Sequence, residues 1–450
     1  MQVLPSSYRD NDGFVFEQAG KIYRFIRPGY EANYRLLMSG GLYEGLVNNK
    51  LLVSHEELPY TTSFNLPAGR LILPQQIDFI SYPYEWSFDM WQDAALLTLQ
   101  IASASLEKGM LLKDATPFNV QFQKGRPVFI DSLSFDKYEE GKPWIAYRQF
   151  CECFLAPLLL MHHCRHDTNK FFTAFPNGIP LDMLISLLPK KASWNLDTWL
   201  HIYLQAKLSH KSKYKKNTDR HFSKKKMLVL LNGLQSFVKK LSLKKSSSAW
   251  DDYYTTTITG STYLDEKTKL VNAFLHDISY SSVIDLGAND GHFSLLQKDK
   301  RVIAIDADAN CINELYKKAR KEQLDILPLA IDLLAPSPAI GWNNRERDSI
   351  TARLKADLVM ALALLHHLAI TNNVPLPSIA AWLKPMSEYL LIEFIPKEDE
   401  KLQLLLQNRE DIFTTYSVSS FKEAFEEHYT ILQEAIIADT NRLLFLLKRK

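Results

Sequence analysis

The stretch VIDLGANDGHFS, residues 283–294, decides the fold of the C-terminal half. An apolar, β-branched run leads into two glycines, Gly287 and Gly291, and a helical pattern then starts at Phe293. Glycines suit a turn where the backbone approaches a ligand closely and the amides of the next helix point toward that ligand. The stretch therefore predicts a strand, a ligand-binding turn and a helix.

The sequence on both sides of this stretch alternates short apolar runs with helical patterns, which is typical of βαβ units and a mostly parallel sheet. Five runs are predicted as strands, and two further runs are predicted to close the sheet as a terminal hairpin. The five are 282–286, 301–305, 325–329, 357–361 and 389–394, and the hairpin is 429–434 with 442–447. We expect an α/β fold here.

Acidic residues follow three successive predicted strands. Asp306 ends RVIAID, 21 residues beyond Asp285, where a carboxylate is placed to accept hydrogen bonds from ribose hydroxyls. Asp332, in LPLAIDLL, is placed to accept from an adenine amino group. Together these acids predict an adenosine pocket without a phosphate cradle.

On these motifs, residues 250–450 resemble the class I S-adenosylmethionine-dependent methyltransferases, which implies a Rossmann-like seven-stranded fold and S-adenosyl-L-methionine as cofactor. The resemblance implies that the glycine turn and Asp285 contact the methionine half, that Asp306 holds the ribose and that Asp332 contacts adenine. A dehydrogenase-type fold is the alternative, and the terminal hairpin argues against it. The implied cofactor-binding residues are Asp285, Gly287, Asn289, Gly291, Asp306 and Asp332.

The fourth predicted strand, in ADLVMALALLHHL, is where the resemblance places catalytic groups. Its tip lacks the Asn-Pro-Pro-Tyr type of motif that grips a planar amino group, so a hydroxyl acceptor is favoured. His366, and after it His367, is a candidate base, because histidine titrates near neutral pH. Glu393, expected at the same rim, is the second candidate, and structural roles for all three are the alternative.

Two further segments are candidates for covering this site. The insertion before the fourth strand holds Trp342, Arg345, Arg347 and Arg353, which could grip an anionic acceptor or form a solvated loop. Trp250, Tyr253 and Tyr254 could form a lid.

The N-terminal half contains a second constellation, within MLLKDATPFNVQFQKGRPVFIDSLSF, residues 110–135. Asp114, Asn119 and Asp131 surround a predicted hairpin that turns at Lys124 and Gly125. A loop carboxylate beside an Asn and an Asp that hold Mg²⁺ is the arrangement of phosphoryl transfer. A helix is predicted over 89–108.

This half resembles protein-kinase-like and aminoglycoside-phosphotransferase-like folds, which implies Asp114 as the base position and Asn119 and Asp131 as metal positions. The hairpin FVFEQAGKIYRFIR would match the small lobe, with Lys21 or Arg24 as the strand lysine. No glycine-rich phosphate loop is visible, so we expect a degenerate site that selects substrate or partner. ATP- and Mg-dependent phosphotransfer is one alternative function, and a non-catalytic adaptor that binds RNA or a membrane surface through the basic segment 207–245 is the other. The two halves together resemble bacterial nodulation-type methyltransferases.

Charge is unevenly distributed along the 450 residues. The formal net charge is +2, but Lys207–Lys245 carries thirteen Lys and Arg against one acid, Asp219. An apolar stripe over 227–241 recurs there at helical spacing, and a domain, a partner protein or an anionic membrane or RNA surface could bury it. We expect packing on a domain. The predicted domains are 1–206, the basic segment 207–249 and 250–450.

The number of cysteines and the hydropathy of the sequence indicate the cellular compartment. Four cysteines are too few for a disulfide framework, which favours a reducing cytoplasm. Neither a signal-peptide pattern nor an apolar run of about 18 residues is present, so no transmembrane segment is expected. The residues Cys151, Cys153, His162, His163, Cys164 and His166 lack a Cys-x-x-Cys pair, and we predict a buried helix and no metal.

Overall fold

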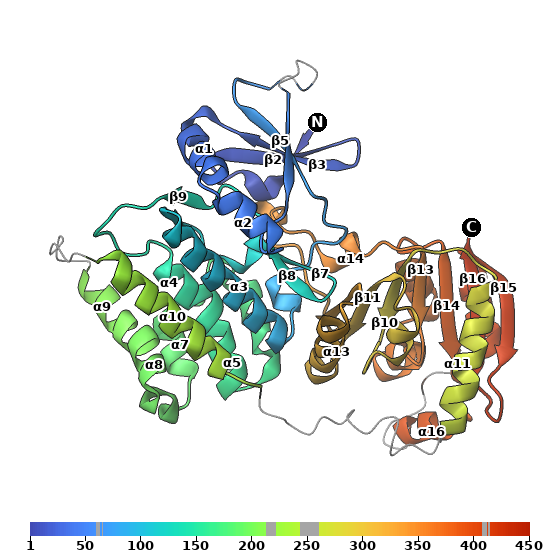
Figure 1. Cartoon of the computed structure of the whole chain (residues 1–450). Helices are drawn as coiled ribbons and strands as arrows, with labels where there is room; N and C mark the ends of the chain where they lie inside the picture. The colour runs from blue at the N-terminus through green and yellow to red at the C-terminus, as the bar shows by residue number, and fades with distance from the viewer. Residues whose placement is uncertain (60–63, 65, 213–221, 244–260, 407–411, 413–414) are drawn as a thin grey trace. The chain divides into compact units, whose positions relative to one another are not determined.

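The computed structural model describes residues 1–59, 64, 66–212, 222–243, 261–406, 412 and 415–450 (Figure 1). The chain divides into two compact units, Met1–Lys245 with Ser337–Ile350, and Ser246–Pro336 with Thr351–Lys450. Two differences from the predicted domains stand out. The basic helix belongs to the first unit, and so does a segment from the middle of the C-terminal half.

The first unit begins with a sheet of antiparallel pairs in the order β1-β2-β3-β5-β4, and the helices α1 (Glu31–Ser39) and α2 (Leu42–Asn48) follow β3. The predicted hairpin in FVFEQAGKIYRFIR is confirmed as β2 and β3. The strand bounds are β1 Gln2–Val3, β2 Gly13–Gln18, β3 Lys21–Ile26, β4 His55–Leu58 and β5 Arg70–Pro74.

The long helix α3 (Phe88–Glu107) organises the rest of this unit and confirms the helix predicted over 89–108. The short strands after it include the predicted hairpin, which turns at Lys124 and Gly125, both with positive φ. They are β6 Met110–Leu112, β7 Val120–Gln123, β8 Arg126–Phe129 and β9 Phe135–Lys137. The helices are α4 Tyr147–Phe150, α5 Ala156–His163, α6 Phe171–Ala174, α7 Leu181–Leu187, α8 Leu196–Thr198, α9 Leu204–Ser212 and α10 Lys224–Lys240.

The apolar stripe of α10 is buried within its own unit, as the sequence predicts. Met227, Leu231 and Leu234 are buried, and α10 lies along α3. The side-chain amide of Gln92 donates to the carbonyl oxygens of Val238 and Leu241, at 2.8 Å each. Burying this stripe against α3 removes its apolar area from water and fixes the helix.

In the described part of the second unit, seven strands form a mixed sheet in the order β12-β11-β10-β13-β14-β16-β15. Strands β10 to β14 run parallel, and β15 and β16 form an antiparallel hairpin against β14. All seven predicted strands and the terminal hairpin are confirmed. The bounds are β10 Ser282–Leu286, β11 Arg301–Asp306, β12 Ile326–Ala330, β13 Leu358–Ala361, β14 Tyr389–Phe394, β15 Tyr429–Ile436 and β16 Leu443–Arg449.

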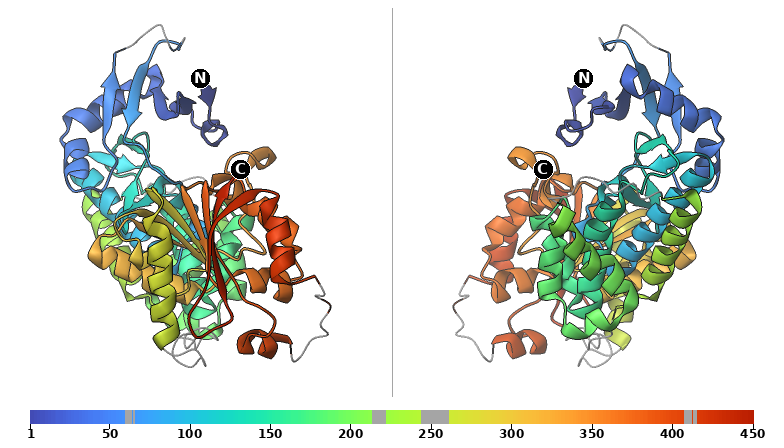
Figure 2. Two further views of the ribbon diagram at one scale, coloured as in Figure 1. Left: turned by 90° about the vertical axis from the view of Figure 1, so that its right-hand side faces the viewer. Right: turned by 90° about the vertical axis from the view of Figure 1, so that its left-hand side faces the viewer.

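Helices cover both faces of this sheet (Figure 2). On one face α11 (Ser261–His276), α12 (His292–Leu296) and α13 (Ala309–Glu322) bury a common core against β10, β11 and β13. On the other lie α15 (Leu376–Leu383) and α17 (Val418–Glu426), where Phe421 packs on Phe445. Two shorter helices, α14 (Ile350–Arg353) and α16 (Glu400–Leu406), complete the described elements. The strand order reverses between β10 and β13, and crevices at such a switch point bind ligands in open α/β sheets.

The segment Ser337–Ile350 leaves the second unit between β12 and β13 and packs on the first. The Asp348 amide donates to the Tyr82 hydroxyl at 3.2 Å, and the Ser337 hydroxyl donates to Glu85 at 2.5 Å. The guanidinium of Arg347 lies 4.3 Å from the ring centroid of Phe118. Arg347 is therefore not part of a solvated loop, because its side chain is held against an aromatic ring of the first unit.

Candidate functional site

The turn after β10 uses three residues with left-handed backbone. Gly287, Asn289 and Gly291 have φ of +77°, +50° and +82°. The amides of Gly287 and Ala288 both donate to the carbonyl oxygen of Ile305, at 2.8 and 3.0 Å, which ties the turn to the end of β11. The predicted strand, turn and helix are therefore all present.

Gly291 caps α12 and has no room for a side chain. A Cβ atom there would lie 2.4 Å from Cδ1 of Leu315 in α13, well inside van der Waals contact. A left-handed φ adds a cost for any residue that carries a Cβ. Close packing of α12 on α13 thus requires glycine.

Asp306, at the end of β11, is the central acid of the turn. One carboxylate oxygen accepts a hydrogen bond from the backbone amide of Asn289, and the other accepts one from the backbone amide of Asp308, each at 2.8 Å. Burial nevertheless raises the pKa of this carboxyl. Each carboxylate oxygen has a further lone pair, which remains able to accept from a ligand hydroxyl.

Asp285 lies in β10 and is buried. The hydroxyl of Ser294 donates to it at 2.7 Å. Burial, and next the charge of Asp306, raise its pKa to about 6, while Ser294 and Lys267 act in the opposite direction. Burial destabilises the charged form of this carboxyl, and a cationic ligand beside it would stabilise that form.

Asp332 follows β12, the strand next to β11. Its carboxylate accepts from the Leu334 amide at 2.9 Å, and the neighbouring Ile331 amide donates to the Asp306 carbonyl oxygen at 2.8 Å. The carboxyl ends of β10, β11 and β12 therefore bring Asp285, Asp306 and Asp332 to one edge of the sheet.

The end of β13 borders the glycine turn. Leu364 lies 3.5 Å from the position of a Cβ on Gly287, and Ala363 before it has a left-handed φ of +57°. His366 is buried and immediately precedes the π-helical segment His367–Thr371. The ring centroids of His366 and His367 lie 4.1 Å apart. Burial lowers the pKa of His367. Such π-helical turns often occur at functional sites.

The side chain of Glu393, the second candidate for catalysis, is fully buried. The ammonium of Lys267 donates to it at 2.6 Å and the hydroxyl of Tyr263 at 2.7 Å. Burial works to raise its pKa, but Lys267 and Arg442 outweigh that effect and keep the pKa below its ordinary value. The carboxylate is thus held in an ion-pair network.

This network contains residues that the sequence did not single out. Arg442 is 1% exposed and forms a two-pronged pair with Asp399, at 2.7 and 3.0 Å, while a further nitrogen donates to Tyr263 at 2.9 Å. Lys267 also lies 4.9 Å from the ring centroid of Phe293, at the start of α12. The only sequence signal for these charges is a Lys or Arg beside apolar runs, which is common on surfaces too.

In the first unit, the three residues of the predicted phosphotransfer site lie close together. The side-chain amide of Asn119 donates to Asp114 at 3.3 Å and to Ser134 at 3.2 Å, and Ser134 donates to Asp131 at 2.5 Å. Arg24 of β3 forms an ion pair with Asp131. Burial works to raise the pKa of Asp131, but Arg24 holds the pKa below its ordinary value.

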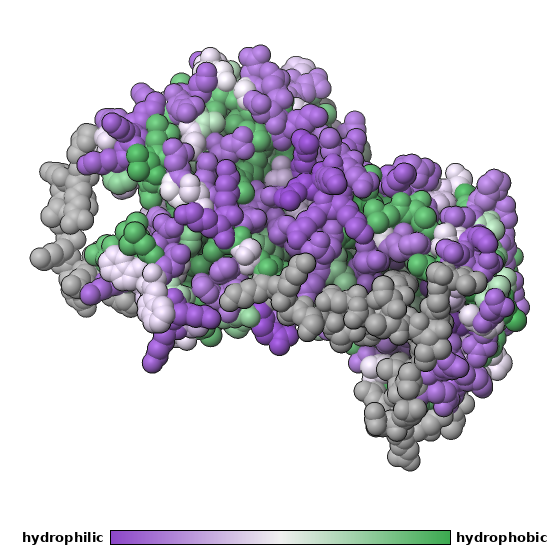
Figure 3. Space-filling view, turned by 60° about the horizontal axis from the view of Figure 1, so that its bottom comes forward, coloured by the Kyte–Doolittle hydropathy of each residue, from purple (hydrophilic) through white to green (hydrophobic). Residues whose placement is uncertain are grey.

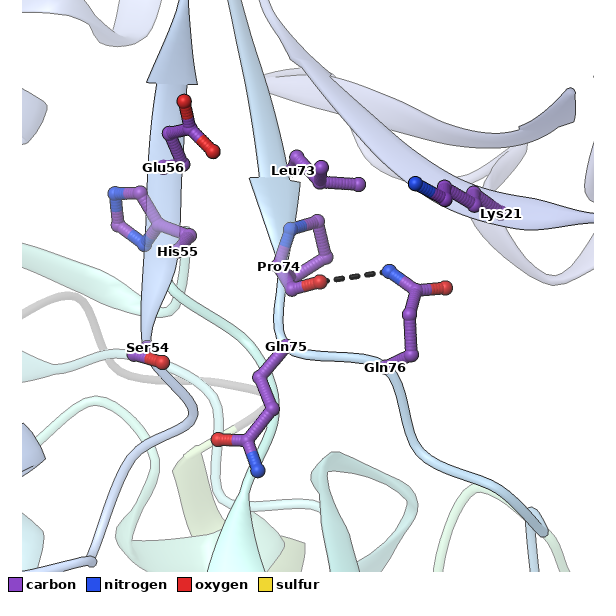
Figure 4. A pocket seen from close by; sticks show the side chains of 8 residues that line it. All are labelled: Lys21, Ser54, His55, Glu56, Leu73, Pro74, Gln75 and Gln76. Atoms are coloured by element: carbon purple, nitrogen blue, oxygen red, sulfur yellow. Dashed lines mark hydrogen bonds between the residues drawn. The ribbon is translucent and has the colours of Figure 1, made fainter.

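A pocket of about 400 Å³ lies beside β4 and β5 of the same unit (Figure 4). The Gln76 side chain bends back to donate to the Pro74 carbonyl oxygen at 2.7 Å. His55, on the pocket wall, is held by the Tyr34 hydroxyl at 2.8 Å, and burial lowers its pKa to about 4. The lining residues are Lys21, Ser54, His55, Glu56, Leu73, Pro74, Gln75 and Gln76.

The described residues contain neither a candidate metal cluster nor a candidate membrane-spanning helix. Within them, no group of three or more His, Cys, Asp or Glu side chains is arranged to hold a metal ion. Cys151 and Cys153 are buried, and burial raises the pKa of both thiols. No described helix has the length and apolar character needed to cross a membrane. Trp250, Tyr253 and Tyr254 lie outside the described residues.

Comparison with known proteins gave relatives of two kinds, while no family model matches the chain. Among solved structures, the N-methyltransferase NodS from Bradyrhizobium japonicum WM9 with bound S-adenosyl-L-homocysteine is 15% identical and has a TM-score of 0.34, covering 45% of this chain and 93% of NodS. The 16S rRNA methyltransferase RmtF is 18% identical with a TM-score of 0.30, covering 42% of this chain and 62% of RmtF.

The full-length relative is the nodulation protein NoeA of Rhizobium meliloti (strain 1021). It is 32% identical over 458 residues, which cover 99% of this chain and 96% of NoeA. Identity of this level over nearly all of both chains identifies a common family. The chain therefore belongs to the NoeA family of nodulation proteins.

Proposed function

We propose that the C-terminal unit binds S-adenosyl-L-methionine and transfers its methyl group to an acceptor. The observation that carries the proposal is the placement of Asp285, Asp306 and Asp332 at the ends of three adjacent parallel strands, beside a left-handed glycine turn. The unit would thus be a methyltransferase.

The chemistry of these residues fits the cofactor. S-adenosylmethionine carries an ammonium and a sulfonium, which carboxylates stabilise, whereas a dinucleotide would bring a pyrophosphate that they repel. When bound, the cofactor supplies an electrophilic methyl carbon. Asp285 would face the ammonium, Asp306 would accept from the ribose hydroxyls, and Asp332 would accept from the adenine amino group.

The chain's own contribution to the reaction is chiefly positioning, since in-line transfer needs the acceptor held against the methyl carbon. His366 follows the strand end that borders Gly287, so it is our candidate for removing the proton from an acceptor hydroxyl. We assign Glu393 a positioning role instead, because it is paired inside the sheet with Lys267.

For His366, the test is turnover compared with cofactor binding. His366→Asn should lower kcat about 100-fold, while binding of S-adenosylhomocysteine stays within twofold. An unchanged kcat would rule out this role. The acceptor is to be identified by its mass gain in cell extract.

For the N-terminal unit we propose a kinase-like, degenerate domain that selects the acceptor or a partner. The cluster of Asp114, Asn119 and Asp131 supports the ancestry. The ion pair between Arg24 and Asp131 supports the degeneracy, because the guanidinium neutralises a carboxylate that Mg²⁺ would need.

Thermal denaturation distinguishes the two functions. A ligand at 100 times its Kd stabilises a protein by about 2.7 kcal/mol, which raises Tm by several degrees. We expect S-adenosylhomocysteine to raise Tm and Mg-ATP to leave it unchanged. A shift with Mg-ATP that is lost in Asp131→Asn would instead establish phosphotransfer competence in the first unit.

A further inference from the structure

The helix that runs through α8, the π-helical segment Trp199–Tyr203 and α9 has an exposed apolar stripe. Leu196, Trp199 and Leu200 are spaced i, i+3 and i+4, which places them on one face. They are 74%, 45% and 42% exposed, and Leu208 continues the stripe with 45% exposure. The opposite face is buried, so this helix is covered on one side only.

Trp194, immediately before the helix, is 86% exposed. An aromatic side chain removes about 150–250 Å² from water when it is buried, and at Trp194 most of this area stays exposed; large exposed apolar patches mark interaction sites. We call Trp194, Leu196, Trp199, Leu200 and Leu208 the Trp194 patch. Hydrophobic and near-neutral side chains gather at one end of the helical part of this unit in Figure 3.

Exposed lysines lie close to the Trp194 patch in the sequence. Lys190, Lys191 and Lys207 are exposed, and Asp197 is half-buried. A partner that fits these residues therefore has an apolar region to take up the exposed side chains and negative charge to attract the lysines.

We propose that the Trp194 patch docks this protein on the surface of an anionic lipid bilayer. Tryptophan rings prefer the headgroup level of a bilayer, leucine side chains reach the acyl boundary, and lysines near the surface are attracted to anionic headgroups. The three leucines of the patch have no comparable use in binding RNA, where bases stack on aromatic and Arg side chains. Docking is peripheral, and it would bring the methyl-transfer site to acceptors at the membrane.

Co-sedimentation of the full-length protein with vesicles tests this inference. Vesicles of phosphatidylcholine with about 30% phosphatidylglycerol should bind the protein at least tenfold more tightly than vesicles of phosphatidylcholine alone. Binding should weaken in high salt, because salt screens the lysines. The double variant Trp194→Ala/Trp199→Ala should lose about tenfold in binding, and Lys190→Glu/Lys191→Glu a similar factor.

Trp342→Ala is the matched control, since Trp342 is another exposed tryptophan, 72% exposed, away from the Trp194 patch in the sequence. It should leave vesicle binding unchanged. All variants change exposed residues, and an unchanged Tm would confirm that they fold. Absence of vesicle binding in the wild type, equal binding of the Trp194→Ala/Trp199→Ala variant, or an RNA oligonucleotide bound through the same residues would each overturn the proposal. None of these results depends on cofactor binding.

Discussion

Gly291 stands where the fold leaves no room for a side chain, so Gly291→Ala is a sharp test at the residue scale. The added Cβ would clash with Leu315, and the left-handed φ of +82° adds strain. We expect a loss of about 2–4 kcal/mol in the free energy of unfolding, measured by urea denaturation.

Gly233 in α10 supplies the control for that change. Nothing lies within 4 Å of a Cβ built there, and its φ is not left-handed. Gly233→Ala should therefore stabilise the protein by about 0.5–1 kcal/mol, as Ala does in a helix. Equal effects of the two substitutions would contradict our account of the turn.

Asp285 predicts a pH dependence of cofactor binding. Its pKa of about 6 in the folded protein lies above the ordinary value of 3.8 because of burial. Below pH 6 the carboxyl is protonated and loses its attraction for an ammonium group. We expect the affinity for S-adenosylhomocysteine to fall about tenfold from pH 7 to pH 5, and the Asp285→Asn variant to bind weakly at both.

The same raised pKa affects stability with a definite sign. The unfolded carboxyl ionises near pH 4, whereas the folded one holds its proton to about pH 6, so the stability that protonated Asp285 provides is lost as pH rises through this window. The full shift corresponds to about 3 kcal/mol. Asp285→Asn should thus stabilise the protein more at pH 7.5 than at pH 4.5, in urea denaturation at both values. The reverse order would contradict the burial that we describe.

Single residues also show where sequence reasoning succeeds. The placement of Asp285, Asp306 and Asp332 at one edge of the sheet was predictable, because each follows a short apolar run and parallel strands bring their carboxyl ends together. The ion-pair partners of Glu393 could not be predicted from the sequence. Lys267 lies 126 residues away from Glu393 in the sequence, and only the fold brings the two side chains together.

At the scale of elements, α11 is fastened to the sheet by the buried pair of Lys267 and Glu393, at 3% and 0% exposure. Lys267→Met removes the ammonium that donates directly to the buried carboxylate of Glu393 and leaves Arg442, at 3.9 Å, as the remaining cation beside it. Removing one partner of such a pair costs about 3–5 kcal/mol. We expect this loss in urea denaturation.

Lys269 on the same helix provides the comparison, since its pair with Glu266 is on the surface. Exposed i,i+3 pairs contribute little, so Lys269→Met should leave the free energy of unfolding nearly unchanged. If Lys267→Met were equally mild, the buried pair would not fasten α11.

Packing of α10 is the second test at this scale. Leu234 is fully buried, whereas Val229 on the same helix is 65% exposed. Leu234→Ala should cost about 2–5 kcal/mol and Val229→Ala close to nothing, measured by urea denaturation. Similar small effects would mean that α10 is not part of the first unit's core.

Most of the predicted helices and strands could be located from the sequence. Each strand of the C-terminal sheet begins and ends within two residues of its prediction, because apolar runs and turn residues mark strand ends clearly. The π-helical segment at His367–Thr371 was not predictable, since it depends on how the chain after β13 packs beside the glycine turn.

At the scale of the whole molecule, sequence reasoning gave two domains but not their membership. Ser337–Ile350 lies within the C-terminal half in sequence, yet it packs on the first unit through Tyr82, Glu85 and Phe118. Such non-local contacts have no periodicity in the sequence. Charge patterning did locate the basic segment, and the structure adds the exposed Trp194 patch beside it.

Isothermal titration of S-adenosylhomocysteine into the full-length protein tests the central claim, that the three strand-end acids form a methyltransferase cofactor site. The wild type should bind, and Asp306→Ala should weaken binding at least tenfold, because hydrogen bonds to a charged group contribute about 1.5–3 kcal/mol. Glu322→Ala, at the exposed end of α13, should bind like the wild type. No binding to the wild type, or equal binding to Asp306→Ala, would contradict the claim.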